Sequence, residues 1–141
     1  MTEVVIATAV VAILGALTIP VMGAYFRSAT VAGAAQEMRS ALRRARQLAI
    51  TGRQTICVHV ATPAQYELRA GGCANAPLQL PGANATGAFA LANGVRLSNA
   101  GPDVAFTATG AAAPGGQFVV NGAAGERRTV TVSPTGRIVT P

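Results

Sequence analysis

The fold is decided by residues 3–26, which read EVVIATAVVAILGALTIPVMGAYF. From Val4 to Phe26 this segment contains 23 residues without a charge. A hydrocarbon core about 30 Å thick is crossed by roughly 20 apolar residues in a helix, so the segment is long enough to span a bilayer. It also lacks the polar face that a helix on the surface of a soluble domain needs. We therefore expect residues 1–26 to form a hydrophobic transmembrane helix.

Glu3 is the one charged residue of this segment and stands at its edge. A carboxylate costs roughly 3 kcal/mol near the centre of a bilayer and less near the interface, so an acid in such a place is by default a functional hypothesis. The obvious requirement is a cationic partner. The alternative is a carboxylate solvated among lipid headgroups, and the residue type alone does not separate the two.

The helix should continue beyond the apolar run to about residue 51. A stripe of small and apolar residues at steps of three and four predicts an amphipathic continuation. The members of this stripe are Ala35, Met38, Leu42, Ala45 and Ala49. Gly52 predicts the C-terminal stop, because glycine accepts a left-handed cap most easily. Pro20 has no N–H for the helix ladder and should bend or loosen it, while Gly15 permits close approach of another helix.

Residues 54–141 are predicted to form a β-rich globular domain, which follows the amphipathic helical segment over residues 27–53. Alternating or β-branched stretches separated by Gly and Pro predict strands. These stretches are residues 55–60, 65–70, 94–98, 103–108, 117–121, 127–133 and 136–140. Residues 71–88 are rich in turn formers and predict an irregular loop. The expected fold class is α+β, a long N-terminal helix packed on a small antiparallel β-sheet domain.

Two cysteines, Cys57 and Cys73, flank the first predicted hairpin. They lack a CxxC spacing, and His59 is the only histidine, which argues against a metal site. A disulfide between them would contribute roughly 3 kcal/mol and implies an oxidising compartment. The alternative is a pair of separate buried thiols. We favour the disulfide, and we therefore expect the β domain to lie outside the cytoplasm.

Charge and motif content indicate a binding or structural protein rather than an enzyme. The chain has 11 arginines and no lysine, and after residue 26 these face four acids, a formal charge of +7. Such a surface attracts nucleic acid, anionic headgroups or an acidic protein. No nucleophile–base pair or phosphate-binding glycine loop is present in the sequence, and His59 is expected to be structural. We expect no cofactor and no metal.

The N-terminal segment resembles that of type IV pilins and type II secretion pseudopilins. The resemblance rests on Glu3, the run VVIATAVVAILGALTIP and the placement of Pro20. It implies a longer precursor with a basic leader, which a prepilin peptidase cleaves before the new N-terminus is methylated. It also implies an inner-membrane, single-pass subunit with its globular domain in the periplasm or at the cell exterior. In that family the counterpart of Glu3 pairs with the N-terminal ammonium of a neighbouring subunit.

Two downstream segments are similar to minor pseudopilins of the GspH/FimT type. They are AAQEMRSALRRARQLAITGRQTICVHV over residues 34–60 and VSPTGRIV over residues 132–139. The resemblance implies a structural subunit of a type II secretion pseudopilus or type IV pilus, active in filament assembly or tip initiation. The implied partners are other pilins or pseudopilins in a helical filament, the inner-membrane assembly platform, the prepilin peptidase and membrane lipid. Glu3, Pro20 and Gly15 are the expected residues of filament register and assembly.

Two alternatives stay open within this family. One is a major pilus-forming pilin. The other is a DNA-binding minor pilin for DNA uptake, in which Arg137, Arg127 and Arg128 would contact nucleic acid. The family's DNA-binding members carry a further arginine two positions after the one that Arg137 matches, and here that position is Val139. DNA is therefore the less favoured partner.

Overall fold

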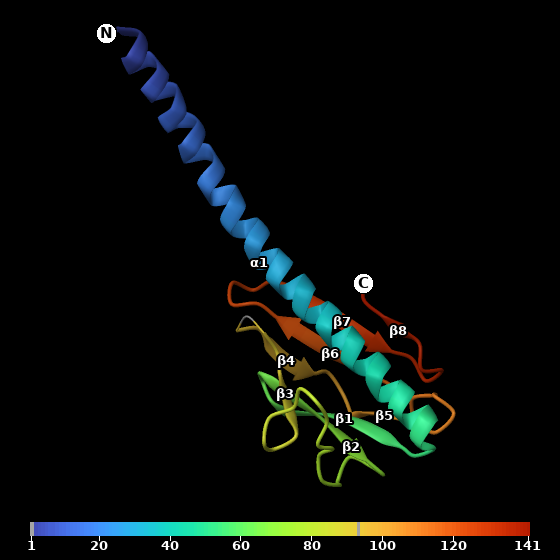
Figure 1. Cartoon of the computed structure of the whole chain (residues 1–141). Coiled ribbons are helices and arrows are strands. Elements are labelled where there is room, and N and C mark those ends of the chain that lie inside the picture. The colour runs from blue at the N-terminus through green and yellow to red at the C-terminus, as the bar shows by residue number, and fades with distance from the viewer. Residues whose placement is uncertain (1, 93) are drawn as a thin grey trace.

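The computed structural model describes residues 2–92 and 94–141, and within the helix it describes only the backbone of residues 2 and 15–21. A single helix, α1 (Thr2–Gly52), dominates the molecule. Figure 1 shows it as one long rod, with the β domain packed against its C-terminal half and the N-terminal half projecting away. Its 51 residues correspond to roughly 75 Å at about 1.5 Å per residue. The helix predicted to end near residue 51 is confirmed.

The C-terminal half of α1 is held by its small and apolar stripe. Every member of the predicted stripe is buried, and three further residues extend it along the same face: Val31, Ala34 and Ala41. Because alanine is short, the helix backbone approaches the sheets closely along this face. The helix ends at Gly52, and Arg53 then takes a left-handed conformation with φ 49°.

The predicted α+β fold, a long N-terminal helix packed on a small antiparallel β domain, is confirmed, and the strands of that domain form two four-stranded sheets. The first sheet has the order β3-β2-β1-β5 and the second the order β4-β6-β7-β8. The strands are β1 (Ile56–Thr62), β2 (Gln65–Ala70), β3 (Ala88–Ala90), β4 (Arg96–Asn99), β5 (Val104–Phe106), β6 (Gly116–Asn121), β7 (Arg127–Val132) and β8 (Ile138–Val139). Two hairpins, β1–β2 and β6–β7, form the centres of the sheets. Helix α1 packs against strands of both sheets.

The division into two sheets arises between β4 and β5. β4 pairs with β6, whereas β5 crosses to the other sheet and pairs with β1 through Ile56 and Phe106. Local alternation predicts where strands lie but not which distant strand each one pairs with. The inner faces of the two sheets and the stripe of α1 enclose one apolar core, in which Phe106, Phe118 and Met38 are the largest fully buried side chains.

Strand β3 lies where the sequence predicts the end of an irregular loop. It has three residues and pairs with β2 through Phe89 and Tyr66. The two rings are stacked with centroids 5.4 Å apart, and the guanidinium of Arg44 lies 5.7 Å from the Phe89 centroid. The edge strand β3 therefore forms around Phe89, an aromatic residue in an Ala- and Gly-rich stretch, because its ring packs against Tyr66 on β2 and Arg44 on α1.

The C-terminal turn before β8 is locked against the end of α1 by two glycines. Gly136 has φ +78°, and a Cβ there would collide with the carbonyl oxygen of Gly110. Gly110 has φ +81°, and a Cβ there would lie 2.8 Å from Cδ1 of Ile50 on α1. Both positions thus require glycine for conformation and for space. This contact explains the glycine of the VSPTGRIV segment by packing.

Candidate functional site

The N-terminal half of α1 presents large apolar side chains to the outside. Their exposed fractions range from 49% at Val10 to 69% at Val11 and Tyr25. The other exposed members are Val4, Val5, Ile6, Ile13, Leu14, Met22 and Phe26. Soluble monomers rarely expose a contiguous apolar surface of this extent, and those that do use it to contact a protein or a membrane. We call residues 4–26 the projecting half of α1.

Polar groups are few in and next to the projecting half. Among them are Thr8, which bonds to the helix's own backbone, and Glu3, which is exposed. The hydroxyl of Thr8 donates to the carbonyl oxygens of Val4 and Val5 at 3.0 Å each. Glu3 lies in the first turn with its side chain exposed, where the helix dipole favours a negative charge. Only the helix backbone is described at positions 15 and 20, so the predicted roles of Gly15 and Pro20 stay predictions.

The described part of the chain has no helical stretch with the combined length and hydropathy that a membrane span requires. The transmembrane helix over residues 1–26 stays a prediction.

An ion pair marks the junction between the projecting half and the β domain. Nε of Arg27, the first charged residue after the apolar run, lies 3.2 Å from Oε1 of Glu126. Glu126 belongs to the turn between β6 and β7. Beside it, a Cβ on Gly122 would lie 2.7 Å from Cγ2 of Val31 and 2.8 Å from Oε2 of Glu126. The turn therefore sits tightly against α1 directly after the apolar run ends.

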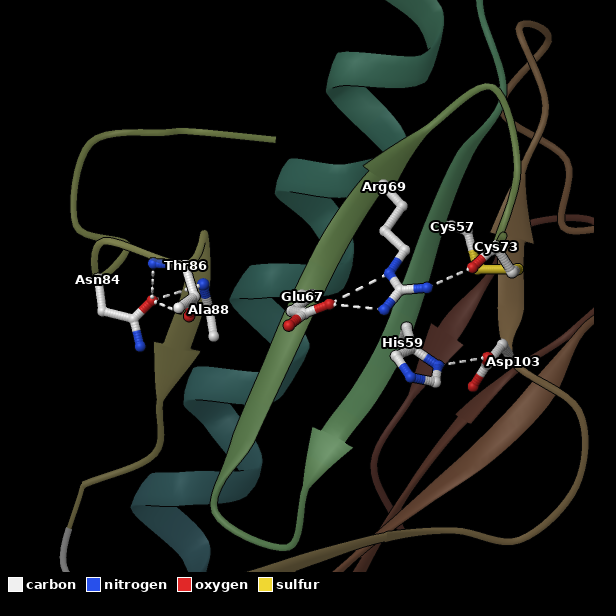
Figure 2. Close-up of polar contacts among 9 residues, drawn as sticks. All are labelled: Cys57, His59, Glu67, Arg69, Cys73, Asn84, Thr86, Ala88 and Asp103. Carbon is white, nitrogen blue, oxygen red and sulfur yellow. Dashed lines mark hydrogen bonds and ion pairs between the residues drawn. A yellow bond between two sulfur atoms is a disulfide. The ribbon is translucent and has the colours of Figure 1, made fainter. Parts of the chain in front are cut away.

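The outer face of the β1–β2 hairpin carries the disulfide and a polar cluster (Figure 2). Cys57 on β1 and Cys73 in the following loop form the predicted disulfide, with Cα atoms 5.1 Å apart. Next to it, Arg69 donates from Nε and Nη2 to Oε2 of Glu67 at 3.1 and 2.9 Å. Arg69 also donates from Nη1 to the carbonyl oxygen of Cys73 at 2.6 Å. The loop after β2 is thus attached to the sheet by a covalent bond and by a charged hydrogen bond.

His59 has an acidic partner that sequence reasoning missed. Its Nδ1 lies 2.7 Å from Oδ2 of Asp103, the residue directly before β5, and Asn99 donates from Nδ2 to Oδ1 of the same carboxylate at 3.1 Å. The pairing depends on β5 crossing to β1, which no local pattern indicates. The assignment of a structural role to His59 stays a prediction, now with Asp103 as its named contact.

The three arginines expected to contact nucleic acid do not lie together. Arg127 and Arg128 begin β7, whereas Arg137 follows the turn beyond its other end. Val132, at the end of β7, pairs with Ile138. About four residues of strand, or roughly 13 Å at about 3.3 Å per residue, thus separate the two places. All three side chains are exposed, but they do not form one basic patch.

Tyr66 is the residue with a strongly shifted pKa. The pKa of Tyr66 is raised to about 12, mainly by burial and secondly by the nearby Glu37, while Arg44 opposes the shift. Both charged neighbours lie on the C-terminal half of α1. The shift follows from packing of the hairpin under the helix, and the stacked Phe89 ring on the edge strand contributes to that burial.

Comparison with known proteins identifies the family. The family of the Type II transport protein GspH matches residues 34–136, which is most of the chain. The chain belongs to the GspH family. It is a minor pseudopilin or pilin with a structural role, in a family of subunits that assemble with others of their kind in a pseudopilus.

Solved structures of such subunits share the fold. The solution structure of Escherichia coli GspH has 16% sequence identity and a TM-score of 0.64, covering 81% of this chain and 89% of that one. The Pseudomonas aeruginosa type IV minor pilin FimU has 21% identity and a TM-score of 0.59, covering 79% and 87%. The minor pseudopilin EpsH from the Vibrio cholerae Type 2 Secretion System has 15% identity and a TM-score of 0.57, covering 76% and 92%. A comparison with curated protein sequences found no significant match.

Proposed function

We propose that this GspH-family chain waits in the inner membrane through the projecting half of α1 and then moves into the core of a filament. The observation that carries the proposal is the exposed apolar surface of residues 4–14 and 22–26, which the chain's own β domain does not cover. Lipid covers that surface before assembly, and the helices of neighbouring subunits replace lipid afterwards. The β domain lies in the periplasm or at the cell exterior, where the disulfide is stable.

Glu3 sets the axial register of the subunit in this proposal. An exposed carboxylate at the tip of an apolar rod becomes costly once neighbouring helices surround it, unless a cation compensates the charge. The processed N-terminal ammonium of a neighbouring subunit has the required charge. Gly15 permits close helix approach, and Pro20 loosens the helix so that it adapts to its neighbours. The assembly platform of the inner membrane and the prepilin peptidase acting on a longer precursor are the further partners.

The test replaces the carboxylate without changing its shape. In cells that assemble the filament, Glu3→Gln should reduce incorporation of this subunit into sheared filaments at least about tenfold. A tenfold reduction requires a free-energy loss of only about 1.4 kcal/mol, and we expect the loss of the charge pair to exceed it. Glu3→Asp keeps the charge and serves as the matched control, with incorporation close to wild type. Membrane fractionation should show equal amounts of all three proteins. Normal incorporation of Glu3→Gln would contradict the register role.

A further inference from the structure

Four side chains of metal-ligating kinds meet on the outer face of the β1–β2 hairpin (Figure 2). The Sγ atoms of Cys57 and Cys73 and a carboxylate oxygen of Asp103 all lie within 4.8 Å of one another. Nδ1 of His59 lies 2.7 Å from that carboxylate. The ligand atoms come from β1, from the loop after β2 and from the segment before β5. The spacing of Cys and His alone therefore does not reveal them, because Asp103 lies 44 positions after His59.

Two thiolates, an imidazole and a carboxylate form a donor set suited to zinc. With Zn–S of about 2.3 Å and Zn–N or Zn–O of about 2.0–2.2 Å, neighbouring ligand atoms of a tetrahedral site lie roughly 3.3–3.8 Å apart. The Asp103 carboxylate already lies within 4.8 Å of both sulfurs and 2.7 Å from Nδ1 of His59. Rotation of the reduced cysteine side chains and of the imidazole is required to bring all four donors to the tetrahedral distances. In the disulfide the sulfurs carry no thiolate charge and do not bind the cation. We propose that the reduced chain binds one zinc-class divalent cation through Cys57, Cys73, His59 and Asp103.

Reduction requires an external dithiol, and the geometry indicates where it attacks. Cys57 is fully buried, whereas Cys73 is partly exposed in its loop. A thiolate of the dithiol attacks Sγ of Cys73, and Cys57 leaves as the thiolate. The second thiol of the reagent then closes its own disulfide and releases Cys73. Two electrons pass to the cystine, and cation binding displaces the two cysteine protons.

Two neighbouring contacts keep the four ligands close after the disulfide opens. Asn99 holds Oδ1 of Asp103, which leaves Oδ2 directed toward His59. Arg69 holds the carbonyl oxygen of Cys73 and is itself fixed by Glu67. Contacts of this kind orient the primary ligands of metal sites. The disulfide and the cation are therefore alternative ways to attach the loop after β2 to β1, and oxidation expels the cation.

The test uses the untagged full-length chain in detergent with Co²⁺ as the probe. The chain is reduced with dithiothreitol, the reagent is removed under argon, and Co²⁺ is titrated. We expect one equivalent to bind, with thiolate–cobalt charge-transfer absorption and the visible bands of tetrahedral cobalt. The oxidised chain should show neither. Reoxidation of the loaded chain should release the cobalt.

Two ligand variants keep the cysteines and so separate a four-ligand site from two free thiols. Removing a residue that only hydrogen-bonds to a metal ligand costs about 10- to 100-fold in metal affinity. Removing a ligand itself should cost no less, so His59→Gln and Asp103→Asn should each weaken Co²⁺ binding at least tenfold. Glu126→Gln removes a carboxylate far from the site and should not weaken it. The proposal is overturned if the reduced chain binds no cobalt, or if both ligand variants bind as tightly as wild type. If reduction unfolds the chain, recovery of its circular dichroism on adding Co²⁺ supports the site, and no recovery overturns it.

Discussion

Helix α1 carries apolar side chains along its whole length, but its two halves bury them differently. In the packed half, residues 31–49, a stripe of apolar side chains from Val31 to Ala49 is buried against the two sheets. In the projecting half the large apolar side chains described, which lie within residues 4–14 and 22–26, stay exposed in the isolated chain. Both halves obey the same hydrophobic effect. The difference teaches that the partner of the packed half is part of this chain, whereas the partner of the projecting half is supplied from outside.

The largest expected effect on stability comes from a cavity in the packed half of α1. Leu42 on α1 is fully buried, so Leu42→Ala should lower the free energy of unfolding of the β domain by about 2–5 kcal/mol. Ile13→Ala removes a similar volume from the projecting half, where the side chain is 61% exposed, and should leave that free energy nearly unchanged. Urea unfolding of both variants in detergent, followed by near-UV circular dichroism, measures the difference. Equal losses in the two variants would remove the distinction between the halves.

The next effect concerns the glycine lock at the end of the packed half. Gly136→Ala should destabilise the domain by about 1–3 kcal/mol more than Gly125→Ala. Both glycines have positive φ, but a Cβ on Gly125 meets nothing within 4 Å, whereas one on Gly136 meets the carbonyl oxygen of Gly110. The control thus isolates the collision from the backbone conformation. Thermal melts of the two variants side by side measure it, and similar melting temperatures would contradict the lock.

A smaller effect is the pH dependence of stability that arises because Tyr66 is buried against the packed half of α1. The pKa of Tyr66 is raised from 10.0 to about 12, so the unfolded chain loses this proton first as pH rises. The contribution of Tyr66 to the free energy of unfolding is therefore fully present below pH 10. It is lost between pH 10 and 12, with a loss of about 1.4 kcal/mol at pH 11. Tyr66→Phe should abolish this part of the alkaline loss. Urea midpoints at pH 9 and 11 measure it, and an unchanged loss in the variant would assign it to other groups.

The smallest effect lies at the boundary between the halves. The Arg27–Glu126 pair is largely exposed on the arginine side, so a double-mutant cycle with Arg27→Ala and Glu126→Ala should give a coupling of about 0.2–1 kcal/mol. The coupling should decrease in high salt. A cycle on Arg27 and Glu37 is the matched control and should give no coupling. A coupling above 2 kcal/mol would mean that the junction is held by more than a surface ion pair.

Local patterns in the sequence predicted the elements well and their distant pairings poorly. The stripe from Ala35 to Ala49 predicted the packed face of α1, because helical periodicity is a local property. The strands of both hairpins follow from β-branched residues such as Val58 and Val130 for the same reason. The crossing of β5 to β1 depends on contacts far along the chain, and so do the pairing of His59 with Asp103 and the position of β3. Of the candidate site, the apolar surface and the disulfide were predictable, whereas the separation of Arg137 from Arg127 and Arg128 was not.

The most direct test asks what covers the projecting half in the assembled state. A photoreactive phenylalanine analogue is placed at Val11 in the projecting half or, as the control, at the exposed Arg53 beyond the packed half. In cells that assemble filaments, irradiation should crosslink position 11 to another pilin or pseudopilin subunit, and in cells without the assembly machinery to lipid only. Position 53 should give the same products in both strains. Absence of an assembly-dependent protein crosslink at position 11 would contradict the claim that neighbouring helices cover this half of α1.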